Sequence, residues 1–190
     1  FLRRCGSVGF IVFMLASILL QISFAPYVGF FTKFLAENGY QGASIGLLFS
    51  LGTFAEIFIF MIAGQLLIRY NVKLLMFVCL LMTAMRWLAL AYWVDSWPAV
   101  ALTQLIHALS FGLMHSTSIY FVRTFFPSEQ QNRGQFMYLG AAYGIGGSIG
   151  AALTGVLWQD GDGGPATFLW AALCVSIAAL LILMTPRKKF

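Results

Sequence analysis

Six long runs of apolar residues constrain this chain more than any other feature of its sequence. The runs cover approximately residues 8–31, 43–68, 74–93, 98–121, 136–158 and 167–184. A run of about 20 apolar residues is what an α-helix needs to cross the hydrocarbon core of a bilayer. The connections are short, and several contain turn-forming residues, as in DGDGGP. The sequence therefore predicts an all-α protein with six transmembrane helices, embedded in a lipid bilayer.

Composition agrees with a membrane location and offers no metal or cofactor site. Hydrophobic residues make up 61% of the chain and charged residues 9%, whereas roughly a quarter of the residues of soluble domains are charged. The three cysteines, Cys5, Cys79 and Cys174, are far apart and form neither a disulfide framework nor a metal-binding spacing. No cleavable signal peptide is predicted, because the first apolar run is full length and lacks a small-residue cleavage site beside it.

The charged residues outside the apolar runs separate into two groups in a six-span topology. Basic residues fall on one side, at Arg3, Arg4, Arg69, Lys73, Arg123, Arg133, Arg187, Lys188 and Lys189. Acidic residues fall on the other side, at Glu37, Asp95, Asp160 and Asp162. By the positive-inside rule, both ends of this segment are predicted to be cytoplasmic. The net charge of +5 is thus a topology signal, and nucleic acid is not an expected partner.

The size of the chain suggests half of a larger membrane protein. It begins with Phe1 rather than Met, and FLRR is interpreted as the end of a cytoplasmic linker. Six spans with both ends inside is the size of one half of a major-facilitator transporter, whose halves are parallel six-span repeats. We therefore expect a missing amino-terminal six-helix half as a partner of this segment.

Arg86 lies inside the third apolar run and needs compensation. An arginine in the middle of a membrane helix costs about 3 kcal/mol on insertion scales. The other ionisable residues of the apolar regions are Glu56, His107 and His115, with Lys33 near the outer boundary. Glu56, Arg86 and His107 each lie roughly 10 to 20 Å from the outer end of their span, at about 1.5 Å per residue. Glu56 is therefore predicted to be the counter-ion of Arg86, in a functional site or, alternatively, in a purely structural ion pair.

The fourth run has one polar face. At 100° per residue, the polar side chains within about 80° of His107 are Thr103, Gln104, Ser110, His115 and Ser118. A histidine-bearing polar face at mid-membrane usually lines a hydrated cavity, so Gln104, His107, Ser110 and His115 are predicted to bind substrate or protons. His115, at the margin of the face, is equally compatible with a structural role, and two histidines eight residues apart are poorly placed to share a metal.

Two further patterns concern helix packing. In the fifth run, glycines are spaced for close helix contact, as two pairs: Gly140 with Gly144, and Gly146 with Gly150. In the first run, aromatic residues recur at helical spacing, at Phe24, Tyr27, Phe31 and Phe34. These rings are expected either to stack on an aromatic or sugar substrate or to face lipid, and the lipid-facing interpretation is preferred.

Several segments together resemble a known family. FFTKFLAENGYQG, FAEIFIFMIAGQLLIRYNVKLLM, MRWLALAYW and QLIHALSFGLMH are similar to the carboxy-terminal half of the phenylpropionate permease family, with lactose permease as a more distant relative. The similarity runs along essentially the whole chain. It implies a monomeric proton symporter of the bacterial inner membrane that works by alternating access and is not an enzyme. The glutamate, arginine and histidine that contact sugar, assist deprotonation and bond within the lactose permease site map to Glu56, Arg86 and His107.

The chain departs from lactose permease where that protein carries further charges. Uncharged residues replace two aspartates, the lysine and the proton-carrying carboxylate, at Gln21, Phe24, Gln104 and Ser110. The resemblance thus leaves the proton carrier open between Glu56 and His107. The predicted substrate is an aromatic carboxylate such as 3-phenylpropionate. A sugar or nucleoside is the alternative, and a membrane sensor on the same fold is the non-transporting alternative.

Overall fold

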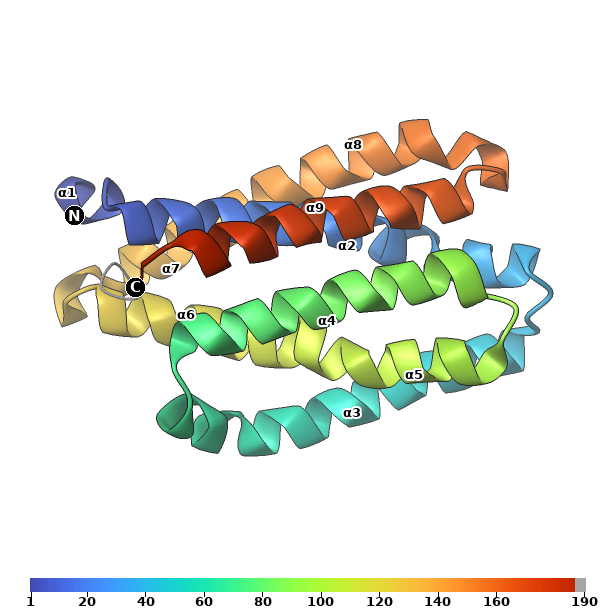
Figure 1. Ribbon diagram of the computed structural model, residues 1–190, viewed down its shortest axis with the longest axis horizontal. Coiled ribbons are helices and arrows are strands. Elements are labelled where there is room, and N and C mark those ends of the chain that lie inside the picture. The colour runs from blue at the N-terminus through green and yellow to red at the C-terminus, as the bar shows by residue number, and fades with distance from the viewer. Residues whose placement is uncertain (187–190) are drawn as a thin grey trace.

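Six long helices run side by side in the computed structural model, which describes residues 1–186 (Figure 1). Four spans are single helices, and two contain a π-helical segment at their middle. The bounds of the first three spans are α2 (Val8–Glu37), α3 (Gly42–Arg69) and α4 (Val72–Trp93). The fourth consists of α5 (Trp97–His107), η1 (Ala108–Leu113) and α6 (Met114–Phe125). The fifth consists of η2 (Ser128–Gln130), α7 (Gln131–Leu139), η3 (Gly140–Gly146) and α8 (Gly147–Trp158), and the sixth is α9 (Gly164–Met184).

Only two short elements lie outside these spans in the described residues, α1 (Leu2–Cys5) and η4 (Gln159–Gly161). All six spans are long and apolar enough to cross a membrane, and residues 1–186 contain no strand. The predicted fold class, an all-α membrane protein with six spans, is therefore confirmed.

Several helices extend beyond the apolar runs that predicted them. The first helix ends at Glu37 rather than near residue 31, and the fifth begins at Ser128 rather than near residue 136. Hydropathy locates only the part of a helix that meets hydrocarbon, whereas backbone hydrogen bonding continues through polar residues at the bilayer surface. Local caps set other boundaries: Asn71 Oδ1 accepts a hydrogen bond from the Lys73 backbone N–H at 2.8 Å, at the start of α4.

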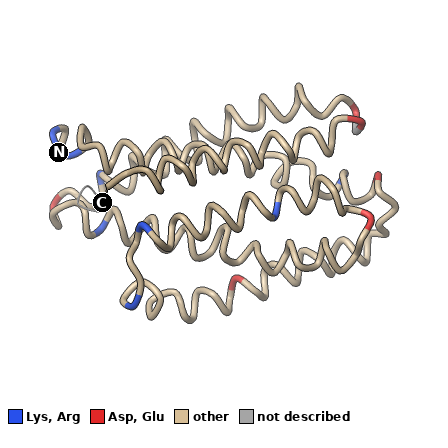
Figure 2. Tube along the Cα trace, in the orientation of Figure 1, with Lys and Arg blue, Asp and Glu red and all other residues tan. Residues whose placement is uncertain are grey.

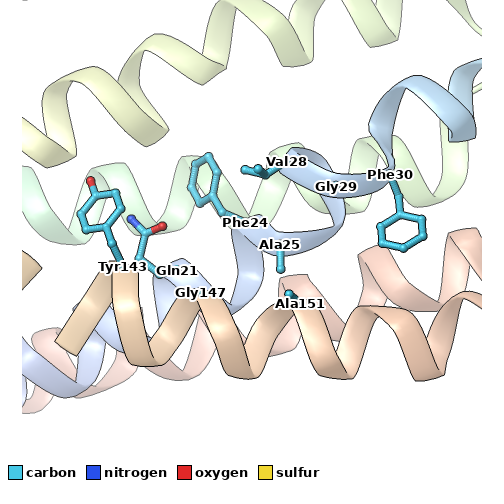
Figure 3. Close-up of a pocket in the computed structure, with 9 residues that line it drawn as sticks. All are labelled: Gln21, Phe24, Ala25, Val28, Gly29, Phe30, Tyr143, Gly147 and Ala151. Atoms are coloured by element: carbon cyan, nitrogen blue, oxygen red, sulfur yellow. The ribbon is translucent and has the colours of Figure 1, made fainter. Parts of the chain in front are cut away.

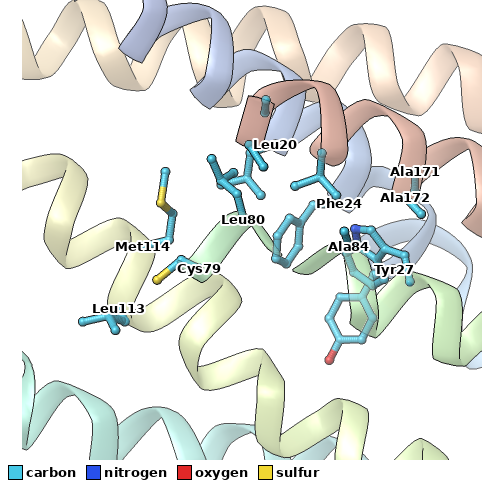
Figure 4. Packing of buried hydrophobic residues seen from close by; sticks show 14 of the residues in the cluster. Leu20, Phe24, Tyr27, Cys79, Leu80, Ala84, Leu113, Met114, Ala171 and Ala172 are labelled. Carbon is cyan, nitrogen blue, oxygen red and sulfur yellow. The ribbon is translucent and has the colours of Figure 1, made fainter. Parts of the chain in front are cut away.

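The spans differ in how far they are buried within this bundle. In the most apolar window of α2, α4 and α9, 50 to 56% of the residues are buried, whereas in α3 and the fifth span only 22% are. Apolar residues of the three well-buried helices interdigitate, among them Leu20, Phe24, Leu80, Ala84, Ala171 and Ala172 (Figure 4). The core of the bundle therefore lies along α2, α4 and α9, and α3 and the fifth span flank it.

The two glycine pairs of the fifth span behave differently. A Cβ atom at Gly146 would stand 2.9 Å from the carbonyl oxygen of Ile18, and one at Gly150 would stand 2.8 Å from Ala25 Cβ. This pair lets the fifth span approach α2 closely, as expected. Gly140 and Gly144 make no such contact within residues 1–186, since a Cβ at either would have no atom within 4 Å there. Both glycines lie on the open side of the helix, which the spacing alone does not distinguish.

Charges outside the interior gather at opposite ends of the bundle. Lys and Arg concentrate at the end that holds the start of α1 and the end of α9, and most Asp and Glu concentrate at the other end (Figure 2). Two residues are exceptions: Glu129 of η2 lies at the basic end, and Lys33 lies at the acidic end, where its Nζ is 3.6 Å from Glu37 Oε1 one turn later. At the basic end, Lys73 Nζ donates to the carbonyl of Leu183 at 2.8 Å and thus caps the end of α9. The predicted basic residues Arg187, Lys188 and Lys189 lie outside the described residues.

Candidate functional site

Glu56 on α3 pairs with His107 at the end of α5. The distance between Glu56 Oε1 and His107 Nε2 is 2.6 Å, and the two side chains are 20% and 13% exposed. The other ring nitrogen, His107 Nδ1, has no hydrogen-bond partner among residues 1–186. The two helices lie in contact at this level, since a Cβ at Gly52 would be 3.6 Å from the His107 ring, an ordinary van der Waals distance. A carboxyl and an imidazole in direct contact form a group that can hold and transfer a proton.

Arg86 on α4 is fully buried without an acidic partner. No ion pair joins it to Glu56 within the described residues, and none of its Nε, Nη1 and Nη2 atoms has a hydrogen-bond acceptor there. The expectation that Glu56 and Arg86 form a direct ion pair was therefore wrong. His107 occupies the carboxylate instead, since the fourth span brings its imidazole within hydrogen-bonding distance of Glu56.

Three aromatic rings surround the Arg86 guanidinium and define an aromatic cage: Phe24, Tyr27 and Trp87. The guanidinium carbon Cζ lies 4.1 Å from the Tyr27 ring centroid, 4.5 Å from that of Trp87 and 5.8 Å from that of Phe24. A desolvated cation–π contact contributes about 2 kcal/mol, against an insertion cost of about 3 kcal/mol for the arginine. The rings thus offset much of that cost, but they leave the N–H donors of the guanidinium unused.

The cage also corrects the lipid-facing interpretation of the α2 aromatics. Phe24, Tyr27, Phe31 and Phe34 are at most 8% exposed. Their helical spacing places them on the face of α2 that packs inward, where Phe24 and Tyr27 meet α4 and the fourth span. In a half-buried membrane helix both faces are apolar, so periodicity alone does not separate the inner face from the lipid-facing one.

Gln104 holds the hydroxyl of Tyr27. The Tyr27 hydroxyl donates to Gln104 Oε1 at 2.9 Å, and Gln104 Nε2 donates to Thr103 Oγ1 at 3.0 Å. All three groups are buried. Gln104, predicted as a binding residue, therefore contacts the site through Tyr27.

The π-helical segment η1 redirects the residues that follow His107. Ser110 is buried and its hydroxyl donates to the Ile106 carbonyl at 3.2 Å, within its own helix. His115 lies beyond Phe111, whose ring stacks at 5.7 Å from His107 and at 6.2 Å from His115. A π-helix has more residues per turn than an α-helix, so the 100° plot fails across η1. The structure thus brings His107 and Gln104 to the aromatic cage and places Ser110 and His115 away from it.

His115 joins a second polar group with the fifth span. Its Nδ1 lies 3.0 Å from the hydroxyl of Tyr143, which belongs to η3. This bond links the first turn of α6, directly after η1, to the π-helical segment η3 of the fifth span. Segments of this kind occur frequently at functional sites.

A cavity of about 270 Å³ lies between α2 and the fifth span. Gln21 and Tyr143 lie side by side at one end, and Phe30 lies at the other (Figure 3). Small residues on both helices leave the space between them, and the complete lining is Gln21, Phe24, Ala25, Val28, Gly29, Phe30, Tyr143, Gly147 and Ala151. Phe24 belongs both to this cavity and to the aromatic cage, so the two adjoin.

Trp87 and Tyr143 belong to the site but were not predicted from the sequence. Trp87 follows Arg86 directly, and its ring is fully buried with Nε1 3.2 Å from Ser23 Oγ. An aromatic residue beside a lone membrane arginine was an available signal, because ring faces stabilise a guanidinium. Tyr143 carried no such signal, since its partner His115 comes from another span.

Comparison with known proteins gives the same class as the fold. The model of the MFS_1 like family matches residues 4–170. The maltose permease of Geobacillus stearothermophilus is 26% identical over 172 residues, which cover 84% of this chain and 42% of that protein. A protein of Escherichia coli (strain K12) described as "Probable 3-phenylpropionic acid transporter" is 25% identical over 170 residues, which cover 90% of this chain and 44% of that protein.

The chain thus spans less than half the length of the curated relatives that it matches. Six membrane-spanning helices over that share of a permease correspond to one half of the major-facilitator fold. Because the family model covers most of the chain, the protein belongs to the MFS_1 like family of the major facilitator superfamily.

Proposed function

We propose that this chain is half of a proton-coupled transporter that moves a small aromatic carboxylate, such as 3-phenylpropionate, by alternating access. The observation that carries the proposal is the fully buried Arg86, whose guanidinium nitrogens have no acceptor within residues 1–186. A guanidinium and a carboxylate form paired, charge-assisted hydrogen bonds. A carboxylate solute would supply the acceptors that Arg86 lacks, and a relative named for 3-phenylpropionic acid supports this substrate class.

The surroundings of Arg86 also suit an aromatic solute. Aromatic rings prefer offset or edge-to-face contact with other rings, and the cage presents three. The adjoining cavity of about 270 Å³ is larger than the roughly 150 Å³ that holds benzene in an engineered apolar cavity. The solute's ring is proposed to enter this cavity beside Phe24 while its carboxylate approaches Arg86.

The proposed proton carrier is the Glu56–His107 pair. When a solute carboxylate occupies Arg86, the site contains a second anion, and a proton on the pair reduces the repulsion between the two anions. Solute and proton would then cross together. The coupling ion is the proton, and no organic cofactor or metal is part of the proposal.

A second six-helix half is proposed to cover the exposed spans. Only 22% of the residues in the apolar windows of α3 and the fifth span are buried in this bundle, and the relatives are more than twice as long as the matched region. The two halves would form a monomeric permease with the solute site between them. The basic end of the bundle would face the cytoplasm of a bacterial inner membrane.

The test uses the full-length protein in de-energised vesicles with a recording of external pH. Addition of 3-phenylpropionate is expected to alkalinise the medium in wild type, and this response is expected to disappear in Glu56→Gln. Protein-free vesicles and Arg86→Met vesicles correct for the uncharged acid that crosses the bilayer unaided. An undiminished response in Glu56→Gln would contradict coupling through this residue. No response to any solute would favour facilitated diffusion or a sensor.

A sugar is the second candidate, because one relative is a maltose permease. Glu56, His107 and Gln104 offer hydrogen-bonding groups of the kind that bind hydroxyls. Maltose and a panel of other sugars, added in the same assay, distinguish the two. A pH response to a sugar and none to 3-phenylpropionate would replace the carboxylate by the sugar as substrate.

A further inference from the structure

Tyr27 lies between the two charged parts of the candidate site. Its ring centroid is 4.1 Å from Arg86 Cζ and 5.0 Å from the centroid of the His107 ring. His107 in turn bonds Glu56 at 2.6 Å. The order of contacts is therefore guanidinium, phenol, imidazole and carboxylate.

The position of the Tyr27 ring is fixed from both ends. Its hydroxyl donates to Gln104 Oε1 at 2.9 Å, and its ring packs at 4.7 Å from Phe31 and at 5.9 Å from Trp87. Figure 4 shows the ring projecting from α2 past Ala84 of α4, with the hydroxyl directed away from that helix. A side chain with two rotatable bonds and one polar anchor can move as a unit if that anchor is released.

Arg86 and Glu56 are oppositely charged groups in the same interior, yet they form no direct ion pair within the described residues. A buried guanidinium without acceptors and a carboxylate two contacts away attract one another, and in an interior of low dielectric constant this attraction is strong. Direct contact would satisfy the N–H donors that the aromatic cage leaves unused. Two groups lie along the chain of contacts between them, the Tyr27 ring and the His107 imidazole, and the Tyr27 ring is the one that contacts the guanidinium.

We propose that Tyr27 is a positioning residue that separates Arg86 from Glu56 and thereby keeps the guanidinium available to the anionic group of the solute. This inference rests on the proposed function and adds a residue to it. Displacement of the ring would expose Arg86 either to the solute or to Glu56. Tyr27 thus decides which of the two anions the arginine meets.

The first test is a mutant cycle that involves no solute. The coupling between Arg86→Met and Glu56→Gln is measured by unfolding of the full-length protein in detergent, in the wild-type and the Tyr27→Leu background. The coupling factor is the ratio by which the effect of the double substitution on the unfolding equilibrium constant departs from the product of the two single effects. In the wild-type background we expect this factor to lie within about threefold of 1. In the Tyr27→Leu background we expect it to be about tenfold or more. Phe34→Leu, a ring loss two turns away on the same face of α2, is the matched control, because the ring contacts of Phe34 are with Trp158 and Phe168; it is expected to behave as wild type. Equal coupling in the two backgrounds would overturn the proposal.

Tyr27→Phe tests the same inference if Tyr27→Leu does not fold. It keeps the ring and removes only the hydroxyl, so the coupling is expected to stay at its wild-type value. A coupling that rises in Tyr27→Phe would show that the hydroxyl, and not the ring, separates the charges, and would also overturn the proposal.

The second test measures binding of 3-phenylpropionate by equilibrium dialysis. Tyr27→Leu is expected to weaken binding about tenfold or more, and adding Glu56→Gln to that variant is expected to restore it to within about threefold of wild type. Weakening without restoration would contradict the role of Tyr27 in separating the two charges. Absence of binding in wild type would count against the proposed substrate, and the solute-free cycle would still decide the role of Tyr27.

Discussion

Arg86 and Glu56 are both charged residues in the interior of the bundle, but their surroundings differ. Arg86 is fully buried against the faces of three rings and makes no hydrogen bond with the described residues. Glu56 is partly exposed and bonds His107 directly. Ring faces stabilise a cation without using its N–H donors, whereas a hydrogen-bonded partner occupies the acceptor. The first arrangement suits binding of an anion, and the second suits exchange of a proton.

The largest expected effect comes from Arg86→Met, which removes the charge and keeps the length. Uptake of 3-phenylpropionate is expected to fall more than about 100-fold, because the anion loses its partner. Stability is expected to rise by about 1 kcal/mol, since an insertion cost of about 3 kcal/mol is removed and a cation–π contribution of about 2 kcal/mol is lost. Vesicle uptake and thermal unfolding in detergent measure the two quantities.

Arg86→Lys is the control for charge. An ammonium keeps the charge but lacks the planar fork that binds a carboxylate through two hydrogen bonds, so uptake is expected to remain low. A clear loss of stability in Arg86→Met would show that Arg86 already has a structural anionic partner in the whole protein. Arg86 and Glu56 would then both be paired residues, and the difference between them would disappear.

The next largest effect is expected from Glu56→Gln, which keeps a hydrogen-bonding group beside His107 and removes the titratable one. Accumulation of 3-phenylpropionate against a gradient is expected to fall about tenfold or more, because the proton gradient no longer drives entry. Counterflow exchange at equal pH on both sides is expected to remain within about threefold of wild type, because it needs no net proton movement. Equal loss of both activities would show that Glu56 binds the solute, and would make the two charged residues alike in function.

A smaller effect is expected from filling the cavity that adjoins the aromatic cage. Ala151→Leu places a larger side chain in the cavity lining and is expected to raise the KM for 3-phenylpropionate about three- to tenfold. Ala152→Leu, on the next residue of the same helix and outside the lining, is the matched control and is expected to leave KM unchanged. Equal KM values in the two variants would exclude the cavity as the site of the solute's ring.

The smallest effect is expected at Lys33 and Glu37, an ion pair at the end of α2. Their side chains are 50% and 34% exposed and 3.6 Å apart, and such surface pairs contribute about 0.5 kcal/mol or less. Lys33→Ala is therefore expected to change unfolding stability by no more than about 0.5 kcal/mol and to leave uptake unchanged. A reduced uptake rate in this variant would show that a charge at the surface also affects transport, in addition to the Glu56–His107 pair and Arg86.

The sequence predicted the members of the site better than their contacts. Glu56, Arg86 and His107 were identified because ionisable residues are rare inside a membrane and are retained there for a reason. Their pairing was not predicted correctly, since Glu56 meets His107 and Arg86 meets Tyr27 and Trp87. Spacing along the chain gives depth in the bilayer but not the rotation of each helix about its own axis.

The two π-helical segments also separate what the sequence predicts from what depends on contacts between helices. Six spans follow from local hydropathy alone, because each helix satisfies its own backbone and needs only about 20 apolar residues to cross the bilayer. The changes of hydrogen-bonding register at η1 and η3 depend on packing against neighbouring helices, and they decide that His115 meets Tyr143.

The sequence by itself therefore determined the class of protein, the number of spans and the small set of residues able to carry charge inside the membrane. Only the tertiary structure decided which of those residues touch, because contacts between spans depend on helix rotation, on the Gly146 and Gly150 approach to α2, and on the ring of Tyr27 between two charges. Hydropathy is a local property of the chain, and these contacts join residues from five different spans.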